Sequence, residues 1–191
     1  PSDGSVPVYS PDDIMNGTLI PGNVLVFDDD HYYMGGVIAE KLAEQGSQVT
    51  LLTPAAYISD WSRNTLDQSF IHQRLVSAGV SPLLNRGLAE IKAGQYVSEC
   101  VYTGSFLAHD IDGIVLVTSQ IQNDSVWHGL ESRQNEWSDA GIKSVRVIGD
   151  AEAPAPIAWA TYAGHRYARL LDTDDIGDAL PFKREVAQLS S

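Results

Sequence analysis

Hydrophobic positions along the chain fall into short continuous runs and longer runs of helical spacing. The short runs are rich in β-forming residues, which is typical of strands buried on both faces of a parallel sheet. The longer runs repeat apolar residues every three or four positions, as amphipathic helices do. The pattern predicts strands at 23–27, 48–53, 81–87, 111–119 and 144–150. It predicts helices at 33–46, 65–79, 124–138 and 155–171.

Polar residues at the ends of these runs predict caps and a linker. Thr65 and Asp124 are expected to cap the helices that follow them. Residues 1–17 are rich in Pro, Gly, Ser and Asp, which predicts an arriving linker. Within it, Ser10 as cap and Pro11 at the first helical position predict one short helical turn.

The order of the elements indicates an α/β fold. Two partly alternating runs at 87–94 and 95–104, split by Ala-Gly, predict an antiparallel hairpin. The full order is strand, helix, strand, helix, strand, hairpin, strand, which predicts a Rossmann-like, mostly parallel sheet. The inserted hairpin resembles the antiparallel β-meander of nicotinamide-binding domains in flavoproteins that bind two dinucleotides.

Charge and cysteine content exclude several classes of function. The formal net charge is −13, with 12 Lys and Arg against 25 Asp and Glu, so nucleic acid and anionic membranes are not expected as partners. The single cysteine, Cys100, excludes an intrachain disulfide and an iron–sulfur site within this chain, and favours a reducing, cytoplasmic compartment. No run of about 18 apolar residues predicts a membrane span. Because the first residue is Pro rather than Met, we interpret the sequence as a piece of a longer protein.

The turn after the first strand has the position of a dinucleotide-binding loop. Such a loop holds a diphosphate because glycines let the backbone approach and the helix N-terminus offers N–H groups. Gly35 fits the third glycine of that fingerprint, but the first two fall near Asp30 and Tyr32. Asp28 and Asp29 add charge that repels phosphate by on the order of 1 kcal/mol for a close pair. The sequence therefore predicts a retained scaffold whose pocket is closed by Asp and Tyr side chains, with no cofactor bound by this chain.

The end of the second strand supports the same interpretation. A ribose-binding carboxylate is expected there, about 20 residues after the turn. Thr53 and Pro54 stand in its place, and an arginine that could hold a 2′-phosphate is no nearer than Arg63. An active NAD(P) site is the alternative. A Mg²⁺ or Ca²⁺ site is disfavoured because adjacent carboxylates on an extended stretch point to opposite sides. Capping of the following helix would explain at least one of the aspartates.

A second nucleotide-like feature lies in residues 145–168. A predicted strand ends at Gly149-Asp150, and a helix with a small-residue face follows it through Gly164. This pattern closes flavin-nucleotide domains, in which the Asp binds a ribityl or ribose hydroxyl. Gly149 and Asp150 are therefore candidate cofactor-binding residues.

Together with other segments, this region resembles the C-terminal part of the trimethylamine dehydrogenase family, which includes dimethylamine and histamine dehydrogenases. The segments are "SPDDIMNG", "AEKLAEQGSQVTLLT", "VLVTS", "SRQNEWSDAGIKSVRVIGDAEAP", "AGHRYAR" and "LPFKRE". The chain is more distantly similar to 2,4-dienoyl-CoA reductase. The resemblance implies a NAD(P)-binding-like domain with a degenerate fingerprint at 18–119. It further implies a return segment to a FAD- or ADP-binding-like domain at 120–171, followed by an acidic tail at 172–191.

The resemblance also implies a parent iron–sulfur flavoprotein that oxidises an amine. FMN and a 4Fe–4S cluster would lie in its barrel and possibly ADP in its FAD-like domain, and electrons would leave to an electron-transferring flavoprotein. The parent is expected to be a homodimer, and this chain to contain neither catalytic residues nor metal ligands. Two alternatives stay open: a NAD(P)H-binding domain that feeds a flavin, and a non-catalytic docking module for a redox partner.

Isolated polar residues predict no further site. The histidines, at 31, 72, 109, 128 and 165, lack metal-ligand spacing. Ser105 and Ser119 lack a nearby His–Asp arrangement. His31 is placed to hydrogen-bond a neighbouring Asp, and Cys100 is expected to be a buried, inert thiol.

Overall fold

The structure, a computed structural model, describes residues 1–171. The chain divides into two compact units, Pro1–Ser119 and a second that begins at Gln120. No helix within the described residues is long and apolar enough to cross a membrane.

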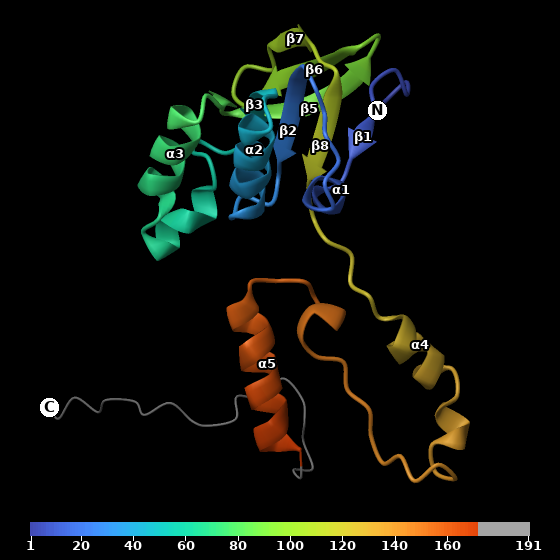
Figure 1. Cartoon of the computed structure of the whole chain (residues 1–191). Coiled ribbons are helices and arrows are strands. Elements are labelled where there is room, and N and C mark those ends of the chain that lie inside the picture. Colours follow the sequence, from blue (N-terminus) through green and yellow to red (C-terminus); the bar gives the residue numbers. More distant parts are fainter. Residues whose placement is uncertain (172–191) are drawn as a thin grey trace, which may run out of the picture. The chain divides into compact units, whose positions relative to one another are not determined.

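The first unit is built on a five-stranded parallel sheet (Figure 1). Its strands, in sheet order, are β1 (Val8–Tyr9), β8 (Gly113–Val117), β2 (Asn23–Asp28), β3 (Gln48–Leu52) and β4 (Ser81–Leu83). The chain runs from β2 outward through β3 to β4, then returns to the other side of β2 as β8. This order confirms the predicted α/β fold with a parallel sheet and places its reversal point at β2.

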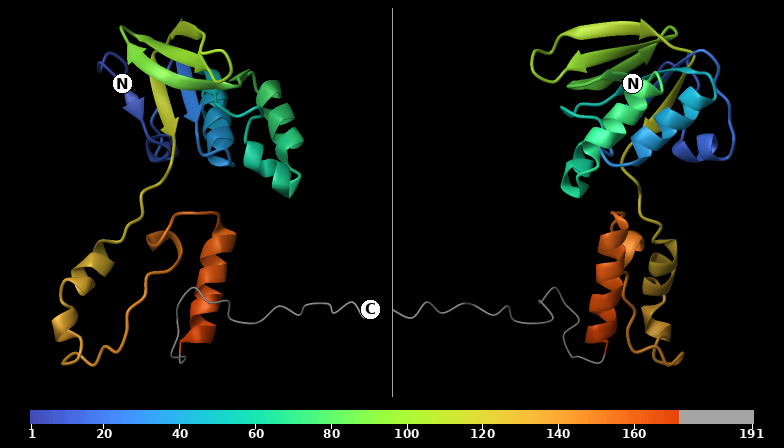
Figure 2. Two further views of the ribbon diagram at one scale, coloured as in Figure 1. Left: turned by 180° about the vertical axis from the view of Figure 1, so that it is seen from behind. Right: turned by 60° about the vertical axis from the view of Figure 1, so that its left-hand side comes forward.

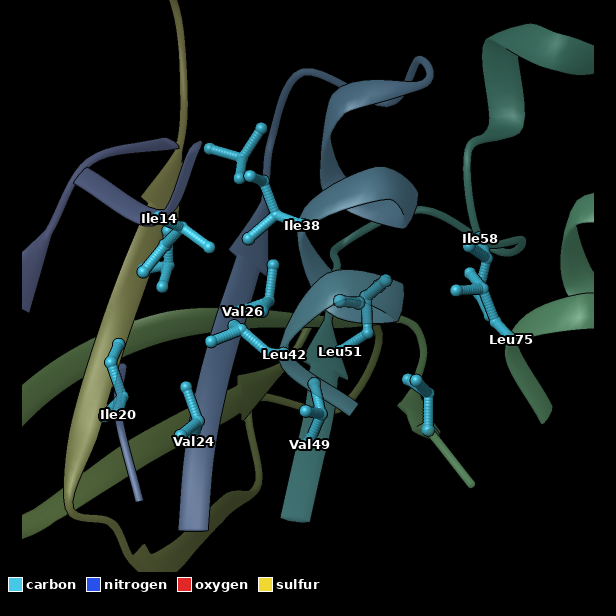
Figure 3. Packing of buried hydrophobic residues seen from close by; sticks show 14 residues of the cluster. Ile14, Ile20, Val24, Val26, Ile38, Leu42, Val49, Leu51, Ile58 and Leu75 are labelled. Atoms are coloured by element: carbon cyan, nitrogen blue, oxygen red, sulfur yellow. The ribbon is translucent and has the colours of Figure 1, made fainter. Parts of the chain in front are cut away.

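Helices cover one face of this sheet. They are α1 (Pro11–Met15), α2 (Met34–Glu44) and α3 (Gln68–Ser77), with a 3₁₀ helix, η1 (Asp60–Thr65), before α3. Val24 and Val26 of β2 point toward Ile38 and Leu42 of α2 in one buried cluster (Figure 3). Apolar burial of this kind is the main source of stability for such a layer.

An antiparallel sheet covers the other face (Figure 2). Its strands are β5 (Arg86–Lys92), β6 (Gln95–Cys100) and β7 (Phe106–Asp110), in that order. Leu25 of β2 packs in a second buried cluster with Ile91 and Tyr96 of this sheet. Ala93 and Gly94 between β5 and β6 both have positive φ, as a two-residue hairpin turn requires. The predicted inserted meander is therefore confirmed.

The alternation of side chains along β2 explains why its sequence is apolar throughout. Val24 and Val26 belong to the cluster on the helix side, and Leu25 to the cluster on the antiparallel side. Successive side chains of a strand point to opposite faces, so a strand covered on both faces has no polar face.

The segment predicted as a linker is instead part of the first unit. Val8–Tyr9 pairs with β8 as the edge strand β1, and Val6 and Ile14 are buried. The cap at Ser10 is confirmed: its hydroxyl accepts from the backbone N–H of Asp13, whose carboxylate accepts from the N–H of Ser10. The segment was predicted as a linker because most of its residues are polar, although its two buried residues, Val6 and Ile14, are apolar.

The helix predicted at 65–79 is shorter than its pattern. The α-helix begins at Gln68, and Thr65 lies in η1 and does not cap it. Of the predicted apolar face, only Leu75 is fully buried, whereas Leu66 is 81% and Phe70 70% exposed. The helical spacing of apolar residues is therefore present, but only a narrow side of the helix, at Leu75, is buried in the core.

The second unit contains α4 (Ser125–Glu131), η2 (Gln134–Glu136), η3 (Gly149–Ala151) and α5 (Ile157–Leu170). No residue of α4 or α5 is buried, and Asp124 makes no side-chain cap. The prediction of a strand at 144–150 is wrong: within residues 1–171, no strand forms there. A strand needs a neighbouring strand for its backbone hydrogen bonds, and no described strand pairs with this segment. The predicted tail at 172–191 lies outside the described residues.

Candidate functional site

The turn between β2 and α2 lies at the carboxyl end of β2, where the sheet order reverses. Ligands of open α/β sheets bind in the crevice at such a point. The helix that follows, α2, has Tyr33 as its N-cap residue, and no side chain caps it. The suggestion that an aspartate of the turn caps this helix is therefore wrong. The aspartates need another explanation.

Asp28, the last residue of β2, is fully buried. Its Oδ1 accepts a hydrogen bond of 3.0 Å from the backbone N–H of His31, while its Oδ2 has no hydrogen-bond partner. Burial raises the pKa of the Asp28 carboxyl from 3.8 to about 6 because desolvation disfavours the charged form. Asp28 is thus a carboxylate inside the turn, whereas Asp29 and Asp30 are exposed.

Gly35 allows the Asp28 carboxyl group to lie against the first turn of α2. A Cβ placed on Gly35 would come within 2.5 Å of Asp28 Cγ and 2.7 Å of Asp28 Oδ2. No real side chain tolerates such contacts without a shift of the backbone or of Asp28. A glycine at this position was expected for close packing of helix on strand, and here the group it accommodates is a carboxylate of the chain itself.

His31 holds the turn in its shape. It has a positive φ of 61°, which is uncommon for a residue with a side chain. Its Nδ1 lies 3.3 Å from Thr53 Oγ1 at the end of β3, and its Nε2 lies 3.5 Å from Asp29 Oδ1. Its carbonyl accepts from the N–H of Trp61 at 2.9 Å. The predicted contact with a neighbouring Asp is confirmed, and Thr53, in the place of a ribose-binding carboxylate, contacts His31.

Ser59 was missed by the sequence analysis. Its side chain is fully buried, its Oγ has no hydrogen-bond partner, and its backbone has a positive φ of 49°. A Cβ on Gly36 would lie 3.5 Å from this Oγ, so Ser59 flanks the first turn of α2. A serine in a loop carries no sequence signal that distinguishes it from a solvent-exposed one.

Arg63, the nearest arginine proposed for a 2′-phosphate, has other contacts. Its guanidinium lies 4.9 Å above the ring centroid of Tyr57, and its Nη1 bonds Asp60 at 3.4 Å. The turn therefore contains a buried carboxylate, two exposed carboxylates and a histidine, with no arginine directed to a phosphate by the contacts described. Carboxylates repel a diphosphate at short range, and the closed pocket stays a prediction.

Comparison with known proteins shows what the chain is similar to. Residues 9–102 match the model of the OYE-like second alpha/beta domain. The chain is 30% identical to dimethylamine dehydrogenase of Hyphomicrobium sp. (strain x), with 96% of this chain aligned. The structure of histamine dehydrogenase from Rhizobium sp. 4-9 matches all of this chain at 56% identity with a TM-score of 0.93.

The chain is homologous to a region of dimethylamine dehydrogenase and of histamine dehydrogenase. A 6-hydroxypseudooxynicotine amine oxidase from Pseudomonas geniculata N1 is a further similar structure, with 33% identity and a TM-score of 0.77 over 84% of this chain and 25% of its own. The chain spans 28% of dimethylamine dehydrogenase and 30% of histamine dehydrogenase. The expected resemblance to the trimethylamine dehydrogenase family is confirmed for this region.

The other residues predicted for a nucleotide site lie in the second unit. Gly149 begins the 3₁₀ turn η3 with a positive φ of 65°, and Asp150 is exposed in that turn. A Cβ on Gly149 would make only ordinary contact with Ala160 of α5. The positive φ of Gly149, and not a lack of space, is therefore what favours glycine at this position. Their role in nucleotide binding stays a prediction.

Cys100 differs from its prediction as a buried, inert thiol. It is half-buried at the end of β6, and its pKa is lowered from 9.0 to about 7, chiefly by a hydrogen bond from the Thr103 side chain. Arg86, which is buried on the neighbouring strand and bonded to Ser98 and Ser105, lowers it further. Within residues 1–171, no group of three His, Cys, Asp or Glu side chains converges as metal ligands would.

Proposed function

We propose that this chain is the nucleotide-domain part, near the C-terminus, of an amine dehydrogenase or N-demethylase. In this role it supports the parent enzyme and has no catalytic centre of its own. The observation that carries the proposal is the match of the whole chain to 30% of histamine dehydrogenase at 56% identity. The parent oxidises a small amine, and its substrate is selected outside this region.

FMN and a 4Fe–4S cluster are the cofactors expected of the parent enzyme. A cluster of this type takes four cysteine thiolates, and this chain has the single Cys100. The residues of this chain therefore do not fit the cluster, which another part of the parent would have to hold. The sequence encoded upstream should contain a barrel with closely spaced cysteines, and its absence would overturn the proposal.

We further propose that the turn at residues 28–36 binds no nicotinamide coenzyme. The buried Asp28 carboxylate and the contact between His31 and Thr53 support this. Calorimetric titration of the chain with NADH and NADPH should show no saturable binding below millimolar concentration. Micromolar binding would favour the alternative, a NAD(P)H-binding domain like that of a 2,4-dienoyl-CoA reductase.

The chain alone should carry out no amine oxidation. Incubation with dimethylamine or histamine and an artificial electron acceptor is expected to give no reduction above buffer, whereas the parent enzyme should reduce the acceptor. Turnover by the isolated chain would contradict the absence of a catalytic centre.

Docking of a redox partner is a second candidate function. The exposed apolar side chains of Trp61, Leu66 and Phe70 on η1 and α3 favour it, because soluble surfaces rarely gather large apolar residues without a contact. The expected partner is an electron-transferring flavoprotein. Co-purification of that flavoprotein with the parent, and its loss in Phe70→Ser, would support docking, whereas undiminished binding by the variant would exclude this face.

A further inference from the structure

A groove lies at the edge of the parallel sheet where its strands begin. β3 starts at Gln48 and β4 at Ser81, each shortly after the preceding helix ends, so the ends of α2 and α3 lie at this edge (Figure 1). The groove has a volume of about 750 Å³, which is the size of a small-molecule site. It lies at the opposite edge of the sheet from the turn at 28–36, which follows the end of β2.

The antiparallel sheet forms the other wall of this groove. Tyr96 of β6 and His109 of β7 line it, and their rings stack with centroids 5.3 Å apart and planes at 25°. Tyr96 is buried in the core, so its ring gives the exposed His109 ring a fixed support. Asp110, the last residue of β7, also lines the groove, and its Oδ1 accepts a hydrogen bond of 2.7 Å from Gln95 Nε2. This wall therefore offers a supported aromatic ring and a positioned carboxylate.

The groove carries negative charge. Among the described residues that line it, Asp110 is the one Asp or Glu, and none is a lysine or an arginine. Gly46, just after α2, and Ala78, the C-cap residue of α3, also line it, so both helix ends border the groove. The last carbonyl groups of a helix lack partners inside the helix and carry a partial negative charge, which favours a cation.

Polar side chains without charge supply further hydrogen-bond acceptors. They belong to Asn23, Ser47, Gln48, Thr50 and Ser81. The Ser47 hydroxyl donates to the Ile20 carbonyl at 2.6 Å, which leaves its lone pairs as acceptors. Apolar side chains such as those of Ala43 and Ile111 complete the lining. A ligand that matches these groups has a cationic donor group and a compact apolar body.

We propose that this groove binds a small organic ammonium ion. The Asp110 carboxylate and the ends of α2 and α3 surround the ammonium group, and the His109 ring packs on the apolar body. An ammonium group supplies a positive charge and three donors, which suit a lining rich in acceptors. A divalent metal ion fits less well, because within residues 1–171 no three His, Cys, Asp or Glu side chains converge. The inference rests on the first unit alone and does not depend on the proposed function.

Phenethylamine and 2-phenylethanol are matched probes, because they share a ring and a size and differ in the charge of the terminal group. Proton–nitrogen correlation NMR of the chain of 191 residues at pH 7.5 and low salt follows both titrations. Phenethylamine should shift the amide signals of Gly46, Gly79 and Ile111 saturably, and 2-phenylethanol should bind at least about tenfold more weakly. Equal affinity for the two probes, or shifts confined to residues outside the groove, would overturn the proposal.

Two pairs of variants test the position of the ammonium group. Asp110→Asn keeps an oxygen that can accept from Gln95, and it should weaken phenethylamine binding about threefold, as loss of an exposed ion pair implies. Gln48→Lys adds a competing cation to the lining and should weaken binding by about tenfold or more. Asp12→Asn and Gln73→Lys make the same charge changes at exposed positions outside the groove and should leave the affinity unchanged. Equal losses in a groove variant and its matched control would show that binding follows net charge alone, which would overturn the site.

Discussion

Asp28 is the residue whose environment differs most from what its type suggests. Aspartate is rarely fully buried without a partner for both oxygens, and here one oxygen has none. The carboxyl group lies at the end of an apolar strand, against a glycine that gives it room. The contact between β2 and α2 thus contains a buried carboxylate, at a cost in desolvation.

That cost predicts a pH dependence of stability that Asp28→Asn should remove. The pKa of Asp28 is raised from 3.8 to about 6, so the folded chain holds this proton more tightly than the unfolded chain. The contribution of Asp28 to stability is therefore greatest below about pH 4 and falls as the pH rises through 6, by roughly 3 kcal/mol in total. In urea unfolding at pH 5, 6, 7 and 8, the stability of Asp28→Asn relative to the unchanged chain should rise from pH 5 to about pH 7 and then stay constant.

Asp13 supplies the matched control for this pH series. Its carboxylate accepts hydrogen bonds from Ser10, which lower its pKa. Its contribution to stability is therefore present above the unfolded pKa and is lost only in more acidic solution. Asp13→Asn should lower stability by a constant amount between pH 5 and 8. A flat difference for Asp28→Asn over the same range would contradict the burial of its charge.

Two adjacent glycines of α2 should respond differently to alanine. A Cβ on Gly35 would meet Asp28 atoms at 2.5 to 2.8 Å, so Gly35→Ala should destabilise the chain by about 1–3 kcal/mol. A Cβ on Gly36 would meet its neighbours no closer than 3.5 Å, so Gly36→Ala should be neutral or stabilising by up to about 1 kcal/mol. Thermal unfolding of both variants measures the difference, and equal effects would contradict the packing of Asp28 on Gly35.

At the scale of elements, α3 shows the limit of a helical pattern. The spacing of apolar residues at 66–76 is that of an amphipathic helix, yet the sheet buries only Leu75 fully. Leu66 ends η1 in a left-handed conformation and extends into solvent. The spacing of apolar residues predicted the helix. The position of the helix at the margin of the sheet determined which of those residues are buried.

Substitutions in α3 should therefore separate burial from hydrophobicity. Leu75→Ala should cost about 2–5 kcal/mol, because it removes buried methyl groups and leaves a cavity. Phe70→Ala should change stability by no more than about 0.5 kcal/mol, since this larger side chain is 70% exposed. Urea unfolding followed by circular dichroism compares the two. A large loss in Phe70→Ala would show that its face is covered in the folded chain.

At the scale of the whole molecule, the two units differ in how much they bury. The first has apolar clusters on both faces of its parallel sheet. In the second, α4 and α5 bury no residue, and exposed apolar side chains such as Ile157 and Trp159 remain on α5. An element without buried apolar area gains little stability from packing.

Limited trypsin digestion should detect this difference. The first cuts are expected in the second unit, after Arg133 or Lys143, because local opening there disrupts few buried contacts. Lys41 and Arg86 of the first unit should be cut later, since cleavage there requires opening of α2 or of the antiparallel sheet. Mass spectrometry identifies the products. Initial cleavage after Lys41 or Arg86 would contradict the difference in burial.

The sequence by itself determined the parallel strands β2, β3, β4 and β8, the antiparallel insertion and the cap at Ser10, because each depends on residues close together in the chain. It also predicts that the turn at 28–36 does not suit a diphosphate, since no glycine stands at the first two fingerprint positions. Only the tertiary structure decided that residues 1–17 join the sheet and that 144–150 pairs with no strand. It alone showed that Asp28, among three adjacent aspartates, is the buried one. Burial and strand pairing depend on which distant segments approach, and local periodicity contains no information about that.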